Sequence, residues 1–116
     1  MAVQRQHTNT RMSQIVIHGD TIYLAGQVDQ ERSADMAGQT QKILDRIDTL
    51  LAEAGSSKNH VLSALIHITD MGNFEAMNAV WDAWLPDDQS PVRTCVEAGL
   101  ARPELLVEVT VIAAKA

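Results

Sequence analysis

The sequence predicts an α/β (α+β) domain in which a mixed sheet carries two helices on one face, in the order β-β-α-β-α-β-β. Short runs of β-prone residues are bounded by turn residues, and two longer segments repeat apolar residues every three or four positions. Two helices can cover only one face of such a sheet. With 116 residues, the chain is predicted to form one domain over residues 1–116, with residues 1–10 frayed.

The first two strands are predicted to form a hairpin. Residues 15–18 and 21–27 are β-prone runs that only Gly19 and Asp20 separate. Two residues that include a glycine, placed between such runs, are typical of a tight antiparallel turn.

The first helix is predicted between Ser33 and Gly55. Ser33 is a residue type that caps helix N-termini, and Gly55 is one that ends helices. The residues that share one helix face, and are therefore expected to be buried, are Met36, Thr40, Ile43, Leu44, Ile47, Leu50, Leu51 and Ala54.

A strand over residues 61–69 and a helix over residues 73–85 follow, and the helix is expected to end before Pro86. The position of this strand after the first helix indicates a crossover connection. Trp81 and Trp84 could stack on a planar ligand, but their spacing favours core filling. The expected buried stripe is Phe74, Met77, Val80, Trp81, Trp84 and Leu85.

The last two predicted strands carry two charged residues, Arg93 and Glu108, that are candidates for a binding site. In residues 91–98, alternation puts Arg93 and Cys95 on one face, and in residues 105–114 it puts Glu108 among aliphatic side chains. An isolated buried charge is costly unless it is paired, so Arg93 and Glu108 are expected to lie near one another in a pocket. Arg93 would there offer a planar fork to a substrate carboxylate. The alternative is a structural ion pair that closes the sheet.

The sheet face without helices is predicted to pack against another copy of the chain. Residues 15–17 and 107–114 are apolar on both sides, whereas a solvated face would alternate apolar with strongly polar residues. We therefore expect a homo-oligomer with active-site groups from the sheet rim at the subunit interfaces.

Composition disfavours several classes of function. A formal net charge of -6 and a pI near 5.0 are unfavourable for nucleic-acid binding, which requires clustered cations. No apolar run approaches the roughly 18 residues of a membrane span, and the first residues do not match a signal peptide. We therefore expect a cytoplasmic protein that binds neither nucleic acid nor membrane. The single Cys95 cannot form an internal disulfide, and whether it is redox-regulated is left open.

No motif predicts a cofactor or a metal, because the glycines are too dispersed for a nucleotide cradle and the histidines lack ligand spacing. Three residues have two interpretations each. His67 is more often a hydrogen-bonded core or interface residue than a catalytic base, and Cys95 is more often a packed thiol than a nucleophile. Asn78 is more often solvated than directed into a pocket.

The C-terminal quarter resembles the signature of the Rid family, also called the YjgF-like family. The segment reads PVRTCVEA over residues 91–98, with Pro103 and then VEV over residues 107–109 after it. Similarity extends over residues 11–114. Further resembling segments are YLAGQ over residues 23–27, NFEAMN over residues 73–78, and WDAW over residues 81–84, which is closest to the short YoaB-like branch.

This resemblance implies a chorismate-mutase-like fold assembled as a homotrimer with ligand clefts between subunits. It also implies hydrolytic deamination of reactive 2-imino or enamine acids, of the 2-aminoacrylate and 2-iminobutanoate type, to 2-keto acids and ammonia without a cofactor. Arg93 matches the residue that holds the substrate carboxylate, and Glu108 matches an acidic residue near the attacking water. Cys95, Asn78 and Gly26 match further substrate-binding positions.

Two departures accompany the resemblance. Met12 and Ser13 stand where deaminase relatives carry a cleft tyrosine, and Ala25 stands where they carry a serine. The alternative function is a non-enzymatic trimer that binds keto acids or other small carboxylates. A ribonuclease is disfavoured by the acidic charge balance. The sequence leaves open which imine is the physiological substrate and which enzyme produces it. It also leaves open whether the oligomer is a trimer or another closed assembly.

Overall fold

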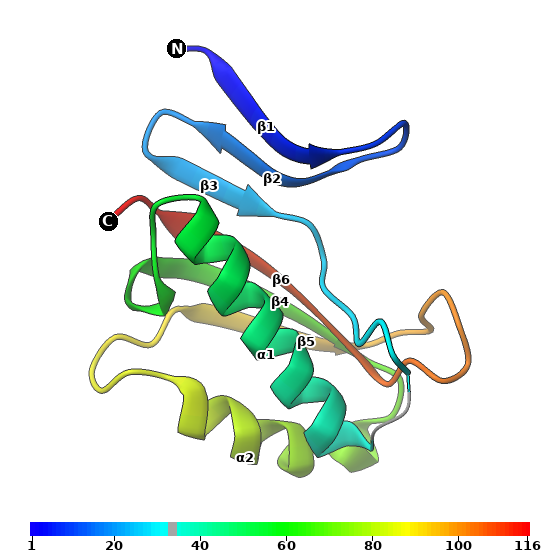
Figure 1. Cartoon of the computed structure of the whole chain (residues 1–116). Coiled ribbons are helices and arrows are strands. Elements are labelled where there is room, and N and C mark those ends of the chain that lie inside the picture. Colours follow the sequence, from blue (N-terminus) through cyan, green and yellow to red (C-terminus); the bar gives the residue numbers. More distant parts are fainter. Residues whose placement is uncertain (33–34) are drawn as a thin grey trace.

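The structure is a computed structural model that describes residues 1–32 and 35–116. Two helices and a sheet make up most of the described chain (Figure 1). The elements are β1 (Val3–Thr8), β2 (Ser13–His18), β3 (Thr21–Leu24), α1 (Met36–Glu53), the short 3-10 turn η1 (Lys58–His60), β4 (Val61–Ile68), the 3-10 turn η2 (Met71–Asn73), α2 (Phe74–Trp84), β5 (Val92–Glu97) and β6 (Val107–Ala114).

The strands form one mixed sheet in the spatial order β1-β2-β3-β6-β4-β5. The pairs β1–β2, β2–β3, β3–β6 and β6–β4 are antiparallel, and only β4–β5 is parallel among the described strands. Strands β3 and β4 run in the same direction on either side of β6, and α1 connects them, which confirms the predicted crossover. Helix α2 connects the parallel pair β4–β5. The predicted mixed sheet with two helices is confirmed, with one additional strand.

That additional strand is β1, and the expectation that residues 1–10 are frayed is wrong. Its backbone pairs with β2 at every position from Val3 to Thr8 except His7, which has a φ of 54°. The turn is closed by the Asn9 side chain, whose Oδ1 accepts hydrogen bonds from the backbone N–H groups of Arg11 and Met12 at 2.8 and 2.9 Å. The side chains of β1 are almost all exposed, so hydrophobic patterning gives no signal for this strand.

The hairpin predicted around Gly19 and Asp20 is confirmed as the β2–β3 connection, with Gly19 at a φ of 63°. Strand β3 ends at Leu24, earlier than the predicted Gln27. Gln27 still touches the sheet through an isolated bridge, in which its N–H donates to Val109 O at 2.8 Å and its carbonyl accepts from Val109 N–H at 3.0 Å.

Helix α1 buries the face that the sequence predicts, because all the residues named for that face are buried. Asp35 is its N-cap and accepts a hydrogen bond from Gly38 N–H at 2.9 Å. The predicted cap Ser33 lies outside the described residues. Gly55 follows the helix with a φ of 84°, a left-handed conformation that favours glycine after a helix.

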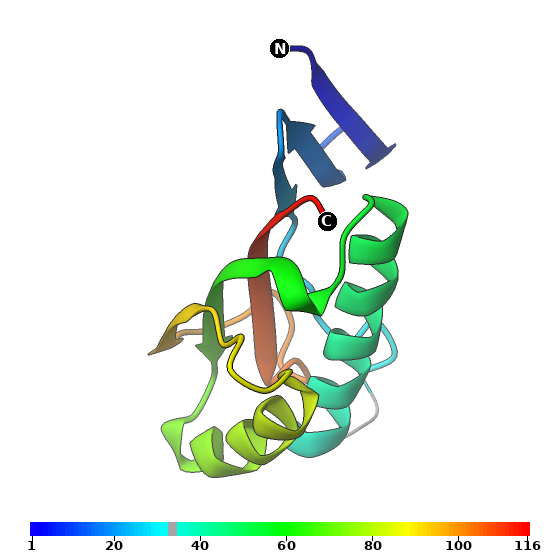
Figure 2. The same ribbon diagram turned by 90° about the vertical axis from the view of Figure 1, so that its left-hand side faces the viewer.

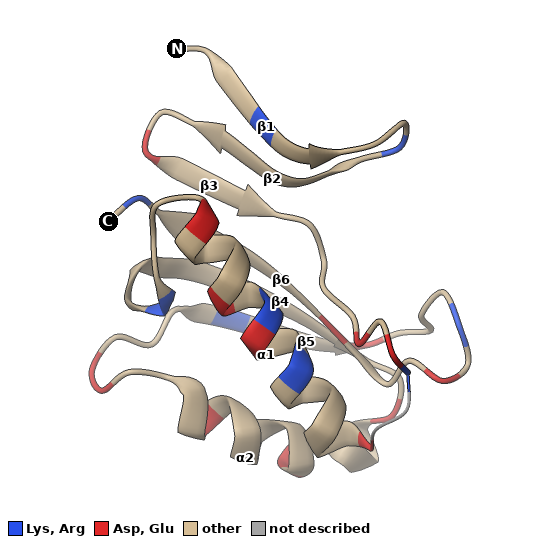
Figure 3. Ribbon diagram, in the orientation of Figure 1, with Lys and Arg blue, Asp and Glu red and all other residues tan. Residues whose placement is uncertain are grey.

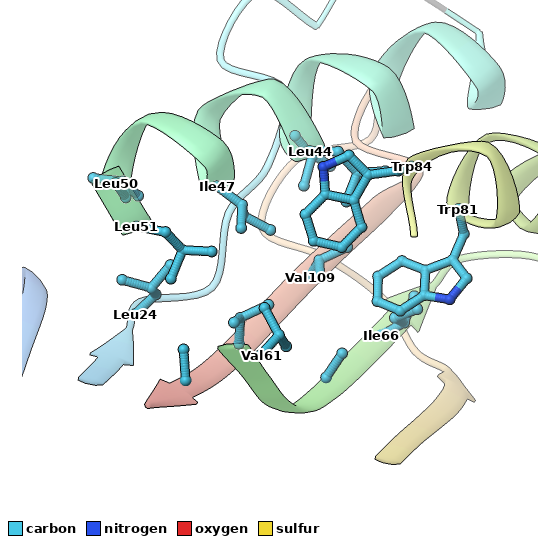
Figure 4. Close-up of a cluster of buried hydrophobic side chains, with 14 of the residues drawn as sticks. Leu24, Leu44, Ile47, Leu50, Leu51, Val61, Ile66, Trp81, Trp84 and Val109 are labelled. Carbon is cyan, nitrogen blue, oxygen red and sulfur yellow. The ribbon is translucent and has the colours of Figure 1, made fainter. Parts of the chain in front are cut away.

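The core lies between the sheet and the two helices (Figure 4). Trp81 and Trp84 of α2 are buried in it, with ring centroids 5.4 Å apart, which confirms core filling as their main role. The indole N–H of Trp84 donates to the Asp48 carboxylate of α1 at 3.1 Å, so its one polar atom is satisfied. Of the predicted α2 stripe, Phe74, Val80 and Leu85 are only partly buried.

Both helices lie on the same side of the sheet, and the opposite side carries no helix among the described residues (Figure 2). We call this opposite side the bare face. Leu65, Val92 and Val96 are 39 %, 71 % and 38 % exposed there. None of the helices within residues 1–32 and 35–116 combines the length and apolarity needed to cross a membrane.

Candidate functional site

Arg93 lies on β5, the edge strand next to β4. In the parallel β4–β5 ladder it is aligned with Ala64, a core residue, so its side chain extends from the helix side of the sheet. There its Nη1 donates to Asn78 Oδ1 of α2 at 2.8 Å. The residue pattern favoured a solvated Asn78, but its side chain instead contacts Arg93 directly.

Two aromatic rings of α2 complete the surroundings of Arg93. Its guanidinium carbon lies 5.7 Å from the centroid of the Phe74 ring and 5.6 Å from that of the Trp81 ring. Cation–π contacts of this kind stabilise a guanidinium by about 0.5–2 kcal/mol each, with the larger value when the pair is desolvated. Phe74, Asn78 and Trp81 follow a spacing of four and three along α2, so one helix face presents all three to β5.

No carboxylate among the described residues forms an ion pair with Arg93. The cation is therefore held by an amide and two rings while part of its hydrogen-bonding fork stays free. Guanidinium forks match carboxylates in bidentate geometry, so this arrangement suits a small carboxylate ligand.

Cys95 extends from the same side of β5 as Arg93 and is aligned with Ile66 of β4. Burial raises the pKa of its thiol above the usual 9.0, and the nearby positive charge of Arg93 lowers it by less. Because a raised pKa leaves little thiolate at neutral pH, a packed thiol is favoured over a nucleophile. We name Phe74, Asn78, Trp81, Arg93 and Cys95 the arginine cluster.

Glu108 lies on β6 and is aligned with His67 of β4. This pair faces away from the helices, because the residues flanking Glu108, Val107 and Val109, are buried in the core. The Glu108 side chain packs over Gly26, where an added Cβ would lie 2.8 Å from its carboxyl carbon and 3.0 Å from Thr110 Oγ1. Glycine at position 26 thus leaves room for the carboxylate. We name Gly26, His67, Glu108 and Thr110 the glutamate cluster.

Arg93 and Glu108 do not share a pocket within one chain, so the expectation that they lie near one another is wrong for the isolated subunit. Strand β4 separates β5 from β6, and its register sends Arg93 to one face and Glu108 to the other. The predicted residues instead form two groups, with Arg93, Asn78 and Cys95 in the arginine cluster and Gly26 and Glu108 in the glutamate cluster. The alternative of a structural Arg93–Glu108 ion pair within the chain is excluded by the same geometry.

Other features of the chain add no metal site. Among residues 1–32 and 35–116, no group of three or more His, Cys, Asp or Glu side chains is arranged to bind a metal ion. A shallow depression bordered by residues 28–31, Lys42 and Arg46 lies beside α1, apart from both clusters. The role of Phe74 and Trp81 beside Arg93 was not predicted, and its one sequence signal is their helical spacing from Asn78.

The fold and the two clusters define a class of protein: a small domain with a two-helix mixed sheet, an edge-strand arginine that pairs with no carboxylate of the described residues, and a glutamate on a bare apolar face. Comparison with known proteins then identifies the family. The family model described as "Endoribonuclease L-PSP" matches residues 3–115. The RutC family protein YoaB of Escherichia coli strain K12 is 40% identical over 114 residues, which are 98% of this chain and 99% of that protein.

Solved structures agree with this assignment. A YjgF family protein from Neisseria meningitidis superposes with a TM-score of 0.97 at 44% identity, covering 100% of this chain and 97% of that one. A family member from Mycobacterium tuberculosis gives a TM-score of 0.84 at 29% identity, covering 90% and 87% of the two chains. The chain belongs to the endoribonuclease L-PSP family, also known as the YjgF or Rid family, as its C-terminal signature predicts. Some members of this family are imine deaminases.

Proposed function

We propose that this protein is a cofactor-independent imine deaminase that hydrolyses 2-imino acids and their enamine tautomers to 2-keto acids and ammonia. The observation that carries the proposal is Arg93, which Asn78 and two aromatic rings hold in place while no carboxylate of the described chain neutralises it. The presence of imine deaminases in the family supports the reaction type.

The proposed site is completed by a second copy of the chain. One subunit presents Arg93 and Glu108 on opposite faces of its sheet, so a single small acid does not meet both within one chain. We propose a homotrimer in which bare faces pack together and Arg93 of one subunit faces Glu108 of the next across a cleft. The exposed apolar side chains of Leu65, Val92 and Val96 support this packing, because their burial would be favourable.

The chemistry requires orientation more than activation, since 2-imino acids already hydrolyse in water. In the proposed reaction, Arg93 holds the carboxylate, and the negative charge of Glu108 stabilises the iminium cation. As a water oxygen bonds to C2, Glu108 accepts one water proton and a carbinolamine forms. Glu108 then returns this proton to the nitrogen, the C–N bond breaks as the hydroxyl oxygen forms the carbonyl, and the hydroxyl proton leaves with ammonia as ammonium.

The departures Met12, Ser13 and Ala25 remove two polar groups from the proposed cleft relative to deaminase relatives. In this chain the Ser13 hydroxyl forms a 2.7 Å hydrogen bond with the Thr8 hydroxyl in the β1–β2 hairpin. We therefore assign substrate binding to the arginine cluster. We expect the substrate range to differ from that of those relatives.

The test couples a purified serine or threonine dehydratase to this protein in the presence of semicarbazide, which traps the imine. Wild type should divert imine to keto acid and lower the yield of trapped product, and Arg93→Ala should not. Arg5→Ala is the matched control, because Arg5 is an exposed arginine on β1. Folded Arg93→Ala protein with wild-type turnover would contradict the proposed role of Arg93.

A non-enzymatic outcome is distinguishable in the same samples. If wild type does not reduce trapping but binds 2-ketobutyrate saturably in calorimetry, and Arg93→Ala does not bind, the protein is a small-carboxylate binder. RNA is a less favourable ligand, because Lys and Arg are spread singly over several elements among more numerous acidic residues (Figure 3). Filter binding to RNA at low salt would reveal such an activity if it exists.

A further inference from the structure

His67 is the residue directly opposite Glu108 in the β4–β6 ladder. Its ring nitrogen Nδ1 is buried and has no hydrogen-bond partner among the described residues. The sequence predicts a hydrogen-bonded core or interface histidine, and within the single subunit Nδ1 has no such bond. Leaving a buried polar atom unpaired costs about 1–3 kcal/mol, so an unpaired ring nitrogen beside the proposed catalytic carboxylate calls for a physical explanation.

The register of β4 and β6 makes the side chains of His67 and Glu108 cross-strand neighbours. Residues directly opposite each other in an antiparallel pair have Cβ atoms about 4.5–5.5 Å apart. The Glu108 carboxylate leans toward Gly26 on the far side of β6 from β4, which leaves space between it and the imidazole. A water molecule or a carboxylate rotamer can bridge that space.

Glu108 is the ionisable group that faces His67 from the strands packed around it. The other side chains that share this face near His67, on β4, β5 and β6, are uncharged: Leu65, Thr94, Val96 and Thr110. Charged neighbours of the same ladders extend from the other face, as Arg93 and Glu97 do on β5. The electrostatic environment of the imidazole on these strands is therefore set by Glu108.

The two ring nitrogens of His67 are not equivalent. Nδ1 is enclosed, so a proton placed there has no acceptor within residues 1–32 and 35–116. The neutral tautomer with its proton on Nε2 avoids burying an unpaired donor and leaves an N–H free to reach the carboxylate.

We propose that His67 is a positioning residue for Glu108: its Nε2–H donates a hydrogen bond to the Glu108 carboxylate, directly or through one water, and orients it for proton transfer with the hydrolytic water. The proposal deepens the proposed deaminase function and rests on it for the catalytic role of Glu108. The pairing of His67 with Glu108 is a structural statement that is tested without turnover.

The first experiment is ¹⁵N NMR of the imidazoles in the intact, assembled protein, with His67→Phe used to assign the His67 signals. We expect the pattern of the Nε2–H tautomer at neutral pH and a clear shift of these signals in Glu108→Gln. His60, exposed in η1, is the internal control and should not shift. His67 signals that are unchanged by Glu108→Gln would overturn the proposal, whatever the activity of the protein.

The second experiment is a double-mutant cycle in the imine-trapping assay. His67→Phe should lower the rate of imine hydrolysis by about tenfold, His67→Gln, which keeps a side-chain N–H donor, should recover part of it, and His60→Phe should have no effect. In the Glu108→Gln background, His67→Phe should lower the rate of imine hydrolysis little further, because there is no longer a working carboxylate to position. Equal losses in both backgrounds would overturn the positioning role. Coupled NMR signals in a protein with no deaminase activity would leave the pairing intact and reject the proposed function.

Discussion

Arg93 and Glu108 extend from opposite faces of one sheet, with strand β4 between their strands. Each lies in a cluster that has its own positioning residues, Asn78 for Arg93 and Gly26 for Glu108. A chemistry that uses both groups on one small acid must therefore bring two chains together, and this requirement leads to the sharpest prediction.

Mixed trimers of Arg93→Ala and Glu108→Gln subunits should be active although each variant alone is inactive. In a cyclic trimer that contains both variants, one interface combines an intact Arg93 with an intact Glu108, so about one third of wild-type activity should return. Coexpression with two affinity tags and purification through both isolates the mixed species for the imine-trapping assay. An inactive mixed trimer would show that both groups of a site come from one chain.

Gly26→Ala should slow catalysis without unfolding the protein. The added Cβ would lie 2.8 Å from the carboxyl carbon of Glu108, the flexible end of a side chain that can move aside. Displacement of the proposed proton acceptor should lower kcat by about tenfold to a hundredfold, while Tm changes little. Gly99→Ala is the control, because an added Cβ there meets no atom within 4 Å. A large drop in Tm for Gly26→Ala would point to a structural role instead.

Asn78→Ala should weaken substrate binding more than it slows the chemical step. The change leaves Arg93 Nη1 without its 2.8 Å partner and loosens the guanidinium. Loss of one hydrogen bond to a charged group costs about 1.5–3 kcal/mol, so KM should rise by about tenfold or more with kcat nearly unchanged. Steady-state kinetics with the coupled assay measures the two constants, and Asn59→Ala, an exposed position in η1, should match wild type. A fall in kcat at constant KM would contradict this role.

Cys95 should react slowly with alkylating agents near neutral pH. Burial raises the pKa of its thiol, so the reactive thiolate is scarce below the usual value of 9.0 and alkylation should accelerate as pH rises past it. Arg93→Met removes the positive charge that lowers this pKa, and should slow labelling further at a given pH. Mass spectrometry of iodoacetamide adducts over a pH series gives the rates, with unfolded protein as the reference thiol. Labelling faster than the unfolded reference at pH 7 would contradict the raised pKa.

Cys95→Ser should keep most of the deaminase activity, because the proposed reaction uses the thiol as a packed neighbour of Arg93 and not as a nucleophile. The imine-trapping assay compares this variant with wild type. Abolished turnover with an intact fold would instead assign a chemical role to the sulfur.

Most elements could be predicted from local patterns. Apolar periodicity indicated the buried face of α1, and the turn residues Gly19 and Asp20 indicated the β2–β3 hairpin. Strand β1 was not predicted, because its side chains are mostly polar and exposed. Backbone pairing with β2 and the Asn9 turn hold it in place, not the burial of apolar side chains.

By itself, the sequence determined which side chains share a face within each strand and within each helix, because alternation and helical spacing are local properties of the backbone. It therefore placed Arg93 with Cys95, and Glu108 with Thr110, correctly. Only the tertiary structure decided that these two pairs lie on opposite sides of the sheet, and that His67 lies across from Glu108. Those relationships depend on the register of β4 with β5 and β6, which is set by pairing between segments far apart in the chain, and a shift of one residue would reverse them.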